Sequence, residues 1–130
     1  MRLAGYAALF DIADGAGDVI RKGAFAAAVA RARQAGLPLF WQHRAEQRIG
    51  AVSHLAEDDR GLQVIARIDN PQGRAGTALA ARAVSGLSFG YRARRYRPLG
   101  KGRLLEEIDL LEVSLVSHPL QHGARVHMLA

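Results

Sequence analysis

Three side chains in this sequence have the types needed for nucleophilic catalysis by a serine: His43, Ser88 and Glu112. A serine hydroxyl is a weak nucleophile until a base removes its proton, and histidine is the usual base because its pKa lies near neutrality. A third group must fix the imidazole tautomer and stabilise the imidazolium. The sequence holds a candidate for each role, but only the fold can bring them together.

The histidine candidate lies where an apolar strand ends and a loop begins, in the segment Trp41-Gln42-His43-Arg44. Strand ends and loops are the places where a scaffold presents functional groups. The alternative is a partly buried histidine whose ring is simply hydrogen bonded to a neighbour.

The serine candidate, Ser88, stands between Gly86 and Gly90 at an expected junction from helix to strand. The glycines would leave room for a substrate carbonyl and for donors to its oxyanion. The letters match the Gly-x-Ser-x-Gly elbow of the α/β-hydrolases, but that elbow requires a strand before the serine and a helix after it. The alternative is a turn serine in a glycine-rich bend.

The carboxylate candidate, Glu112, stands between Leu111 and Val113 in an apolar segment. A carboxylate inside a core strand is costly unless it is paired. An ion pair with one of the many arginines would satisfy it as well as a histidine would.

Metal and thiol chemistry have little basis in this sequence. It has no cysteine, which excludes disulfides, thiolate ligands and cysteine nucleophiles. His118 and His122 are four residues apart, but Pro119 prevents them from sharing a helix face. The sequence therefore predicts neither a metal site nor a cofactor.

The composition is that of a folded chain with a basic balance. The 130 residues are 49% hydrophobic and 23% charged, which predicts one domain over residues 1–130. Eighteen Lys and Arg against twelve Asp and Glu give a net charge of +6, which favours acidic partners or nucleic acid. No apolar run approaches the roughly 18 residues of a membrane span. Asp11 and Asp14 stand where a signal peptide would be cleaved, so the expected location is the cytoplasm.

Hydrophobic periodicity and turn residues predict a small α+β domain. Short turns join most strands, so the sheet should be mostly antiparallel and curled, or closed into a barrel. Regular structure is expected to end at residues 119–123. The expected strands cover residues 3–10, 37–41, 49–55, 62–68, 87–97 and 104–116, and the expected helices cover residues 23–34 and 71–84.

The motifs, taken in order, resemble one family: the prohead (capsid maturation) serine proteases of tailed phages of the HK97 type. The resemblance covers residues 5–124. The segments that carry it are Gly5-Tyr6-Ala7, Lys22-Gly23-Ala24-Phe25, the strand ending in His43, Asp59-Arg60-Gly61-Leu62, Leu87-Ser88-Phe89-Gly90-Tyr91, and Leu111-Glu112-Val113-Ser114-Leu115-Val116 with Pro119.

This resemblance implies the fold of the herpesvirus assembly proteases, a small β-barrel flanked by helices. It implies that Ser88 is the nucleophile, His43 the general base and Glu112 the acidic third member; the herpesvirus branch uses a second histidine instead. The sequence departs from the phage pattern at His118, where Phe is usual, and at Arg44, where Asp is frequent. His118 and Asp109 therefore stay open as alternatives for the third member.

The resemblance also implies a substrate and a place of action. The substrates would be the scaffolding portion of the major capsid protein and the protease itself. Cleavage would take place inside the immature capsid, or prohead, in the cytoplasm of a host bacterium. A homodimer is implied by the herpesvirus relatives, while a membrane or a nucleic acid is not an expected partner. The gene of origin would be that of a phage, a prophage or a gene transfer particle.

A second hypothesis is a catalytically decayed module that assists capsid assembly or binds nucleic acid. The expected strand at residues 91–97 carries four arginines beside Tyr91 and Tyr96, a combination that suits a phosphate backbone. Against this hypothesis, His43 and Ser88 are both present. Loss of cleavage in Ser88→Ala, with the fold retained, would distinguish an endopeptidase from such a module.

Overall fold

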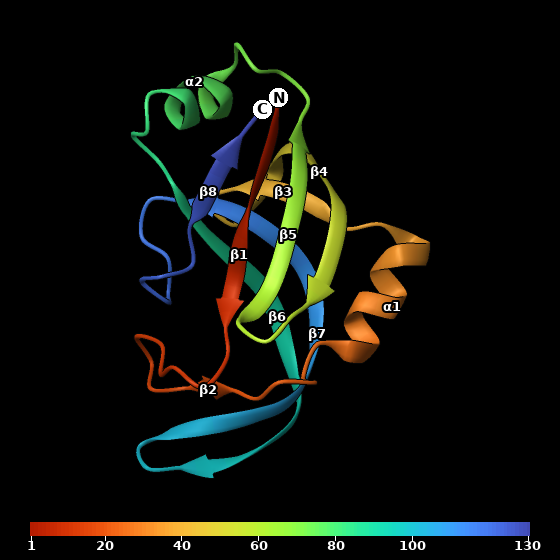
Figure 1. The fold of residues 1–130 in the computed structure, drawn as a ribbon, viewed down its shortest axis with the longest axis vertical. Helices are drawn as coiled ribbons and strands as arrows, with labels where there is room; N and C mark the ends of the chain where they lie inside the picture. Colours follow the sequence, from red (N-terminus) through yellow and green to blue (C-terminus); the bar gives the residue numbers. More distant parts are fainter.

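Eight strands and two short helices make up the fold (Figure 1). The computed structural model describes residues 1–130. The strands are β1 (Arg2–Leu9), β2 (Val19–Ile20), β3 (Pro38–Trp41), β4 (Arg44–Glu57), β5 (Gly61–Ile68), β6 (Gly86–Leu99), β7 (Gly102–Val116) and β8 (Val126–Leu129). The helices are α1 (Ala26–Ala35) and α2 (Arg74–Ala80). Neither helix is long and apolar enough to cross a membrane.

The strands form one sheet in the order β2-β7-β3-β4-β5-β1-β8, with β6 paired to β7 outside this path. Most neighbours are antiparallel, as expected, but β7 runs parallel to both β2 and β3. β6 meets the segment before β8 through a single bridge between Gly86 and Arg125. The sheet is thus curled, but no continuous ladder of strand pairs closes it. The expected barrel therefore stays a prediction. The mostly antiparallel α+β fold agrees with the expectation.

One hydrophobic core lies between the curled sheet and α1. Alternation along β6 and β7 sends Leu87, Val113 and Leu115 into this core, where each is fully buried. Their sequence neighbours Ser88, Glu112 and Ser114 alternate with them and therefore share the opposite face. Because that face is also covered along residues 112–116, the end of β7 is buried on both sides.

α1 begins three residues later than expected, and its N-terminus is capped from a distant strand. Phe25 at the cap position makes no side-chain cap of its own. Instead the Glu57 carboxylate, at the end of β4, accepts hydrogen bonds from the backbone N–H groups of Gly23 (2.9 Å) and Phe25 (2.8 Å). This contact satisfies donors that a helix start leaves unpaired and holds α1 against the sheet.

α2 is shorter than the helix expected over residues 71–84. Asn70 accepts a hydrogen bond from the N–H of Gln72 and so forms a local turn instead of a helix cap. Gly73 is the cap residue. At the other end, Arg82 adopts a left-handed conformation (φ 58°) that ends the helical path.

The expectation that regular structure ends at residues 119–123 is wrong, because β8 follows. β8 is largely exposed and lacks an apolar alternation, so backbone pairing with β1 supplies its order. The two chain ends lie side by side in Figure 1, and Arg2 and Ala130 exchange backbone hydrogen bonds of 2.7 and 2.9 Å. The two-residue strand β2 was likewise not expected.

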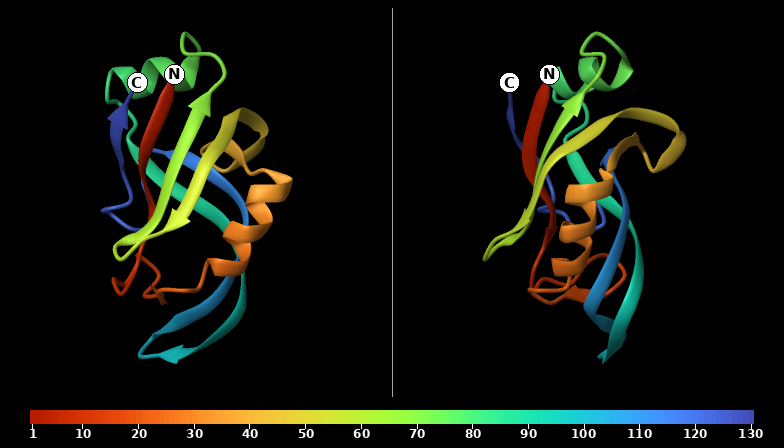
Figure 2. Two further views of the ribbon diagram at one scale, coloured as in Figure 1. Left: turned by 45° about the vertical axis from the view of Figure 1, so that its right-hand side comes forward. Right: turned by 90° about the vertical axis from the view of Figure 1, so that its right-hand side faces the viewer.

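The second half of β6, the turn that follows it and the first half of β7 form an arm at residues 92–109. This arm extends beyond the rest of the sheet (Figure 2). The arm turns at Gly100 and Lys101, in the gap between the expected strands at residues 87–97 and 104–116. Close to this turn, the Arg103 guanidinium forms an ion pair with the buried Asp18 carboxylate at 2.8 Å.

Replacing the distant cap should destabilise the fold measurably. Glu57→Ala leaves two N–H groups at the start of α1 without their acceptor, so the free energy of unfolding should fall by about 1–2 kcal/mol. Urea unfolding followed by circular dichroism measures the change. Glu46→Ala, an exposed carboxylate on the same strand, is the control and should change stability by less than about 0.5 kcal/mol. Equal stability of the two variants would contradict the capping assignment.

Candidate active site

His43 lies in a two-residue turn that joins β3 to β4. Trp41 pairs with Arg44, which leaves Gln42 (φ 52°) and His43 (φ 61°) as the turn residues. Two successive left-handed residues match the right-handed twist of a tight hairpin. Neither is a glycine, so each costs of order 1 kcal/mol of backbone strain. Contacts with β7 and the residues after it must hold the turn in this shape.

Four hydrogen bonds supply those contacts. The Gln42 side chain donates to the Ser117 hydroxyl (2.7 Å) and accepts from the Ser117 N–H (3.1 Å). The Gln42 N–H donates to the carbonyl of Leu115 at 3.0 Å. The His43 N–H donates to the Ser114 hydroxyl oxygen at 3.1 Å. The turn is therefore docked on the end of β7 at both of its residues.

The Glu112 carboxylate lies between His43 and Ser114. The residue is only 5% exposed. Its Oε1 accepts a hydrogen bond from His43 Nδ1 at 2.6 Å, and its Oε2 accepts one from the Ser114 hydroxyl. The buried carboxylate is thus satisfied by the histidine, and the alternative of an arginine partner is wrong.

The contact with Glu112 affects both the pKa and the tautomer of His43. The hydrogen bond that His43 donates to Glu112 raises the pKa of the imidazole; partial burial opposes the rise, and the charge attraction adds to it. Because an ionised carboxylate only accepts, the neutral ring carries its proton on Nδ1 and leaves Nε2 free to accept another. A raised pKa means that this pair stabilises the fold below the ordinary histidine pKa, a contribution lost as pH rises through the elevated value.

Ser88 reaches the same cluster through strand pairing. In the antiparallel ladder of β6 and β7 it lies directly opposite Ser114, and directly opposite residues project from the same face. Ser88 is 8% exposed, and its hydroxyl has no hydrogen-bond partner within the chain, so it is not bonded to the His43 ring. Every fully buried polar side-chain atom has a partner. The Ser88 hydroxyl therefore still reaches solvent.

The glycines near Ser88 allow other parts of the chain to approach closely. A β-carbon at Gly90 would lie 2.7 Å from Glu112 Oε1, and one at Gly86 would lie 2.6 Å from the Val116 carbonyl oxygen and 2.7 Å from Pro119 Cδ. The space at Gly90 is thus occupied by the Glu112 carboxylate, and the space at Gly86 by the end of β7 and by Pro119. Room for a substrate carbonyl beside Ser88 stays a prediction.

The two alternatives for the third member lie outside this cluster. Asp109 forms ion pairs with Arg31 and with Arg94, the latter at 3.1 Å. His118 is exposed in the bend after β7 and forms no hydrogen bond with His43. Glu112 alone of the three candidates contacts the imidazole. The structure also holds no group of three or more potential metal ligands.

The residue types and their spacing predicted no role for Ser114, Gln42 or Ser117. A period-two pattern through β7 would have placed Ser114 on the face of Glu112, because the two residues are two positions apart. Nothing in the sequence pattern points to the contact between Gln42 and Ser117, which depends on how the β3–β4 turn docks.

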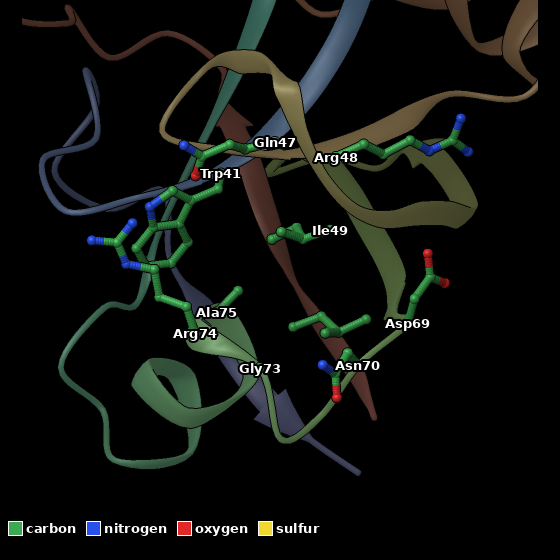
Figure 3. A pocket seen from close by; sticks show the side chains of 10 residues that line it. Trp41, Gln47, Arg48, Ile49, Asp69, Asn70, Gly73, Arg74 and Ala75 are labelled. Atoms are coloured by element: carbon green, nitrogen blue, oxygen red, sulfur yellow. The ribbon is translucent and has the colours of Figure 1, made fainter.

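A cavity of about 240 Å³ lies near the same turn (Figure 3). Trp41, Ile49 and Ile68 give it apolar walls, and the Arg74 guanidinium lies 5.8 Å from the Trp41 ring centre. None of His43, Ser88 and Glu112 lines it. The cavity is therefore separate from the histidine cluster, although Trp41 belongs to the strand that ends at the turn.

Gly90→Ala should displace Glu112 while the fold survives, because the obstructed atoms are the end of a flexible side chain. Loss of the close Oε1–Nδ1 contact should lower the pKa of His43 toward its ordinary value. Titration of the histidine ring protons by NMR measures this. Gly15→Ala, where the nearest heavy atom would be 3.5 Å from the new β-carbon, is the control and should leave the titration unchanged. An unaltered His43 pKa in Gly90→Ala would refute the assignment.

Comparisons with known proteins agree with the sequence resemblance. The prohead protease of Enterobacteria phage HK97 is 31% identical over 129 residues, covering 94% of this chain and 57% of that protein. The structure of KSHV protease in complex with a hexapeptide phosphonate inhibitor is similar, with a TM-score of 0.64 at 14% identity, covering 96% of this chain and 63% of that one. Varicella-zoster virus protease follows with a TM-score of 0.54 at 16% identity, covering 84% and 56%.

The structural likeness shows a herpesvirus protease-like fold, and this chain spans less than two thirds of the length of each of these proteins. The sequence model of one family, described as caudovirus prohead serine protease, matches residues 1–130 in full. The chain therefore belongs to the caudovirus prohead serine protease family.

Proposed function

We propose that this chain is a serine endopeptidase in which Ser88 is the nucleophile, His43 the general base and Glu112 the residue that orients His43. The observation that carries the proposal is the 2.6 Å contact between His43 Nδ1 and the buried Glu112 carboxylate. A carboxylate hydrogen bonded to Nδ1 leaves Nε2 available to accept a serine proton. The two ring nitrogens have these same roles in serine–histidine–acid catalysis. Ser88 lies opposite Ser114 in the β6–β7 ladder and on the same face, which is the face that holds His43 and Glu112.

In the proposed reaction, His43 Nε2 takes the Ser88 proton while the Ser88 oxygen attacks the scissile carbonyl carbon. The resulting imidazolium is stabilised by Glu112 and returns the proton to the leaving amine, which leaves an acyl group on Ser88. Water, giving a proton to His43, then attacks the acyl carbon. The bond from this carbon to the Ser88 oxygen breaks, His43 returns the proton to Ser88, and the product leaves with a new carboxyl terminus. Because His43 must be neutral to accept a proton, activity should rise with pH through its raised pKa.

The substrate follows from the family and not from the site geometry. We infer that the chain cleaves the scaffolding portion of a major capsid protein, and itself, inside the immature capsid within the bacterial host. The chemistry requires no cofactor or metal. A homodimer is part of this proposal, by analogy with the herpesvirus proteases.

The non-enzymatic assembly module remains the alternative, and one observation favours it. Arg92, Arg95 and Lys101 on the arm are exposed and form no ion pair. However, Arg94, Arg97 and Arg103 pair with carboxylates of this same fold, so half of the arm's positive charge is already compensated. A decayed site would be expected to have lost His43 or Ser88, and both are present, which is why the endopeptidase is preferred.

Co-expression with the capsid protein and its scaffolding segment tests the proposal. The intact chain should cleave the capsid protein, and Ser88→Ala or His43→Ala should each reduce cleavage by about 10³-fold or more while circular dichroism stays unchanged. Ser53→Ala is the matched control, because its hydroxyl contacts only the carbonyl of Ile65 at the surface. Cleavage that persists in Ser88→Ala would refute the nucleophile. A folded chain that never cleaves, but binds nucleic acid in a salt-sensitive way, would favour the module.

A further inference from the structure

Ser114 stands at the centre of the cluster and has no part in the proposed reaction. It is fully buried in β7, between the core residues Val113 and Leu115. Its hydroxyl donates to Glu112 Oε2 and accepts from the backbone N–H of His43 at 3.1 Å. Glu112 Oε1 in turn binds the His43 ring. The three hydrogen bonds close a ring that joins the backbone of His43, its side chain and the carboxylate.

We propose that Ser114 is a positioning residue, whose hydroxyl fixes the Glu112 carboxylate and the His43 backbone together and so aligns the imidazole with Ser88. The inference rests on the proposed function and extends it by one residue. Ser114 touches no substrate in this scheme; it acts through Glu112 and His43.

The geometry of the turn explains why such a link is useful. His43 is held in a left-handed conformation, so the direction of its side chain depends on how firmly the strained turn is docked. Without a second fixed contact, the carboxylate of a flexible glutamate side chain would not keep a constant position relative to the turn or to the imidazole ring. The Ser114 hydroxyl supplies both contacts from one rigid position in the middle of a strand.

A purely structural serine would not need both hydrogen bonds. Ser114 occupies a fully buried position in an apolar strand, where alanine would satisfy packing and β-sheet pairing alike. Instead, the Ser114 hydroxyl donates a hydrogen bond to the Glu112 carboxylate and accepts one from the His43 backbone. Both of its hydrogen bonds are therefore made to the pair of residues proposed to act in catalysis.

Gln42 and Ser117 provide the natural contrast. Their hydrogen bonds also hold the turn on the residues after β7, but they touch neither Glu112 nor the imidazole. Ser117→Ala therefore removes an anchor of the backbone without removing a contact of the carboxylate. Comparing it with Ser114→Ala separates docking of the turn from alignment of the pair. Among charged side chains, only Glu112 contacts the His43 ring; the neighbouring Arg44 and His118 are exposed and do not.

The experiment combines two readouts on the full chain. The first is the His43 pKa by NMR, which does not depend on activity. The second is the reaction of Ser88 with a fluorophosphonate probe as a function of pH, separated into the maximal rate of labelling and the probe concentration at half-maximal rate. The variants are Ser114→Ala, Ser114→Thr, Ser114→Cys and Ser117→Ala. The Cys variant fills the space with a weak hydrogen-bonding group, and the Thr variant keeps the hydroxyl.

Ser114→Ala and Ser114→Cys should lower the maximal labelling rate by about 10- to 100-fold with little change in the half-maximal concentration. Both should lower the His43 pKa and move the acidic limb of the rate profile to lower pH. Ser114→Thr should restore the rate and the pKa at least in part, and Ser117→Ala should leave the pKa unchanged.

An unchanged His43 pKa and acidic limb in Ser114→Ala and Ser114→Cys would overturn the inference, as would an equal shift in Ser117→Ala. Failure of the proposed function looks different: labelling would then persist in Ser88→Ala, or be absent from the intact chain. The NMR titration tests the positioning of His43 by Ser114 in either case.

Discussion

The hydrogen bond between His43 Nδ1 and the buried Glu112 carboxylate is the constraint that the rest of the site depends on. A carboxylate in a core strand is tolerable only when its oxygens are paired, and here one oxygen is paired by an imidazole and the other by a buried hydroxyl. The same contact that makes the charge tolerable inside the fold raises the pKa of His43 and fixes its tautomer. Stability and chemistry thus depend on one pair of side chains.

The topology explains how residues so far apart in the sequence meet. β7 pairs in parallel with β3 and antiparallel with β6, so it lies between the strand that leads to His43 and the strand that carries Ser88. Glu112 and Ser114 project from β7 on the face of Ser88, and the β3–β4 turn folds over them. Gly90 keeps that face free for the carboxylate. Because β7 has β3 on one side and β6 on the other, residues from three strands can lie close together in a small fold.

Much of this arrangement was predictable from residue types and patterns. A glutamate between apolar residues in an expected core strand required a partner for Glu112. The order of the helices and the longer strands was predicted, and most of their ends were predicted to within a few residues. Which carboxylate contacts His43 could be known only from three-dimensional contacts: Glu112 binds the imidazole, whereas Asp109 pairs with arginines. Ser114 and β8 were missed for physical reasons: a serine among apolar residues gives no signal of its hydrogen bonds, and β8 owes its order to pairing with β1.

The claim that Ser88, His43 and Glu112 form one catalytic unit can be tested by a crystal structure of the phosphonylated chain. We expect a covalent bond from phosphorus to Ser88 Oγ, with His43 Nε2 within about 3 Å of an oxygen of the adduct. We also expect His43 Nδ1 to remain hydrogen bonded to the Glu112 carboxylate. An adduct on any other serine, or an imidazole turned away from both Glu112 and the adduct, would contradict the claim.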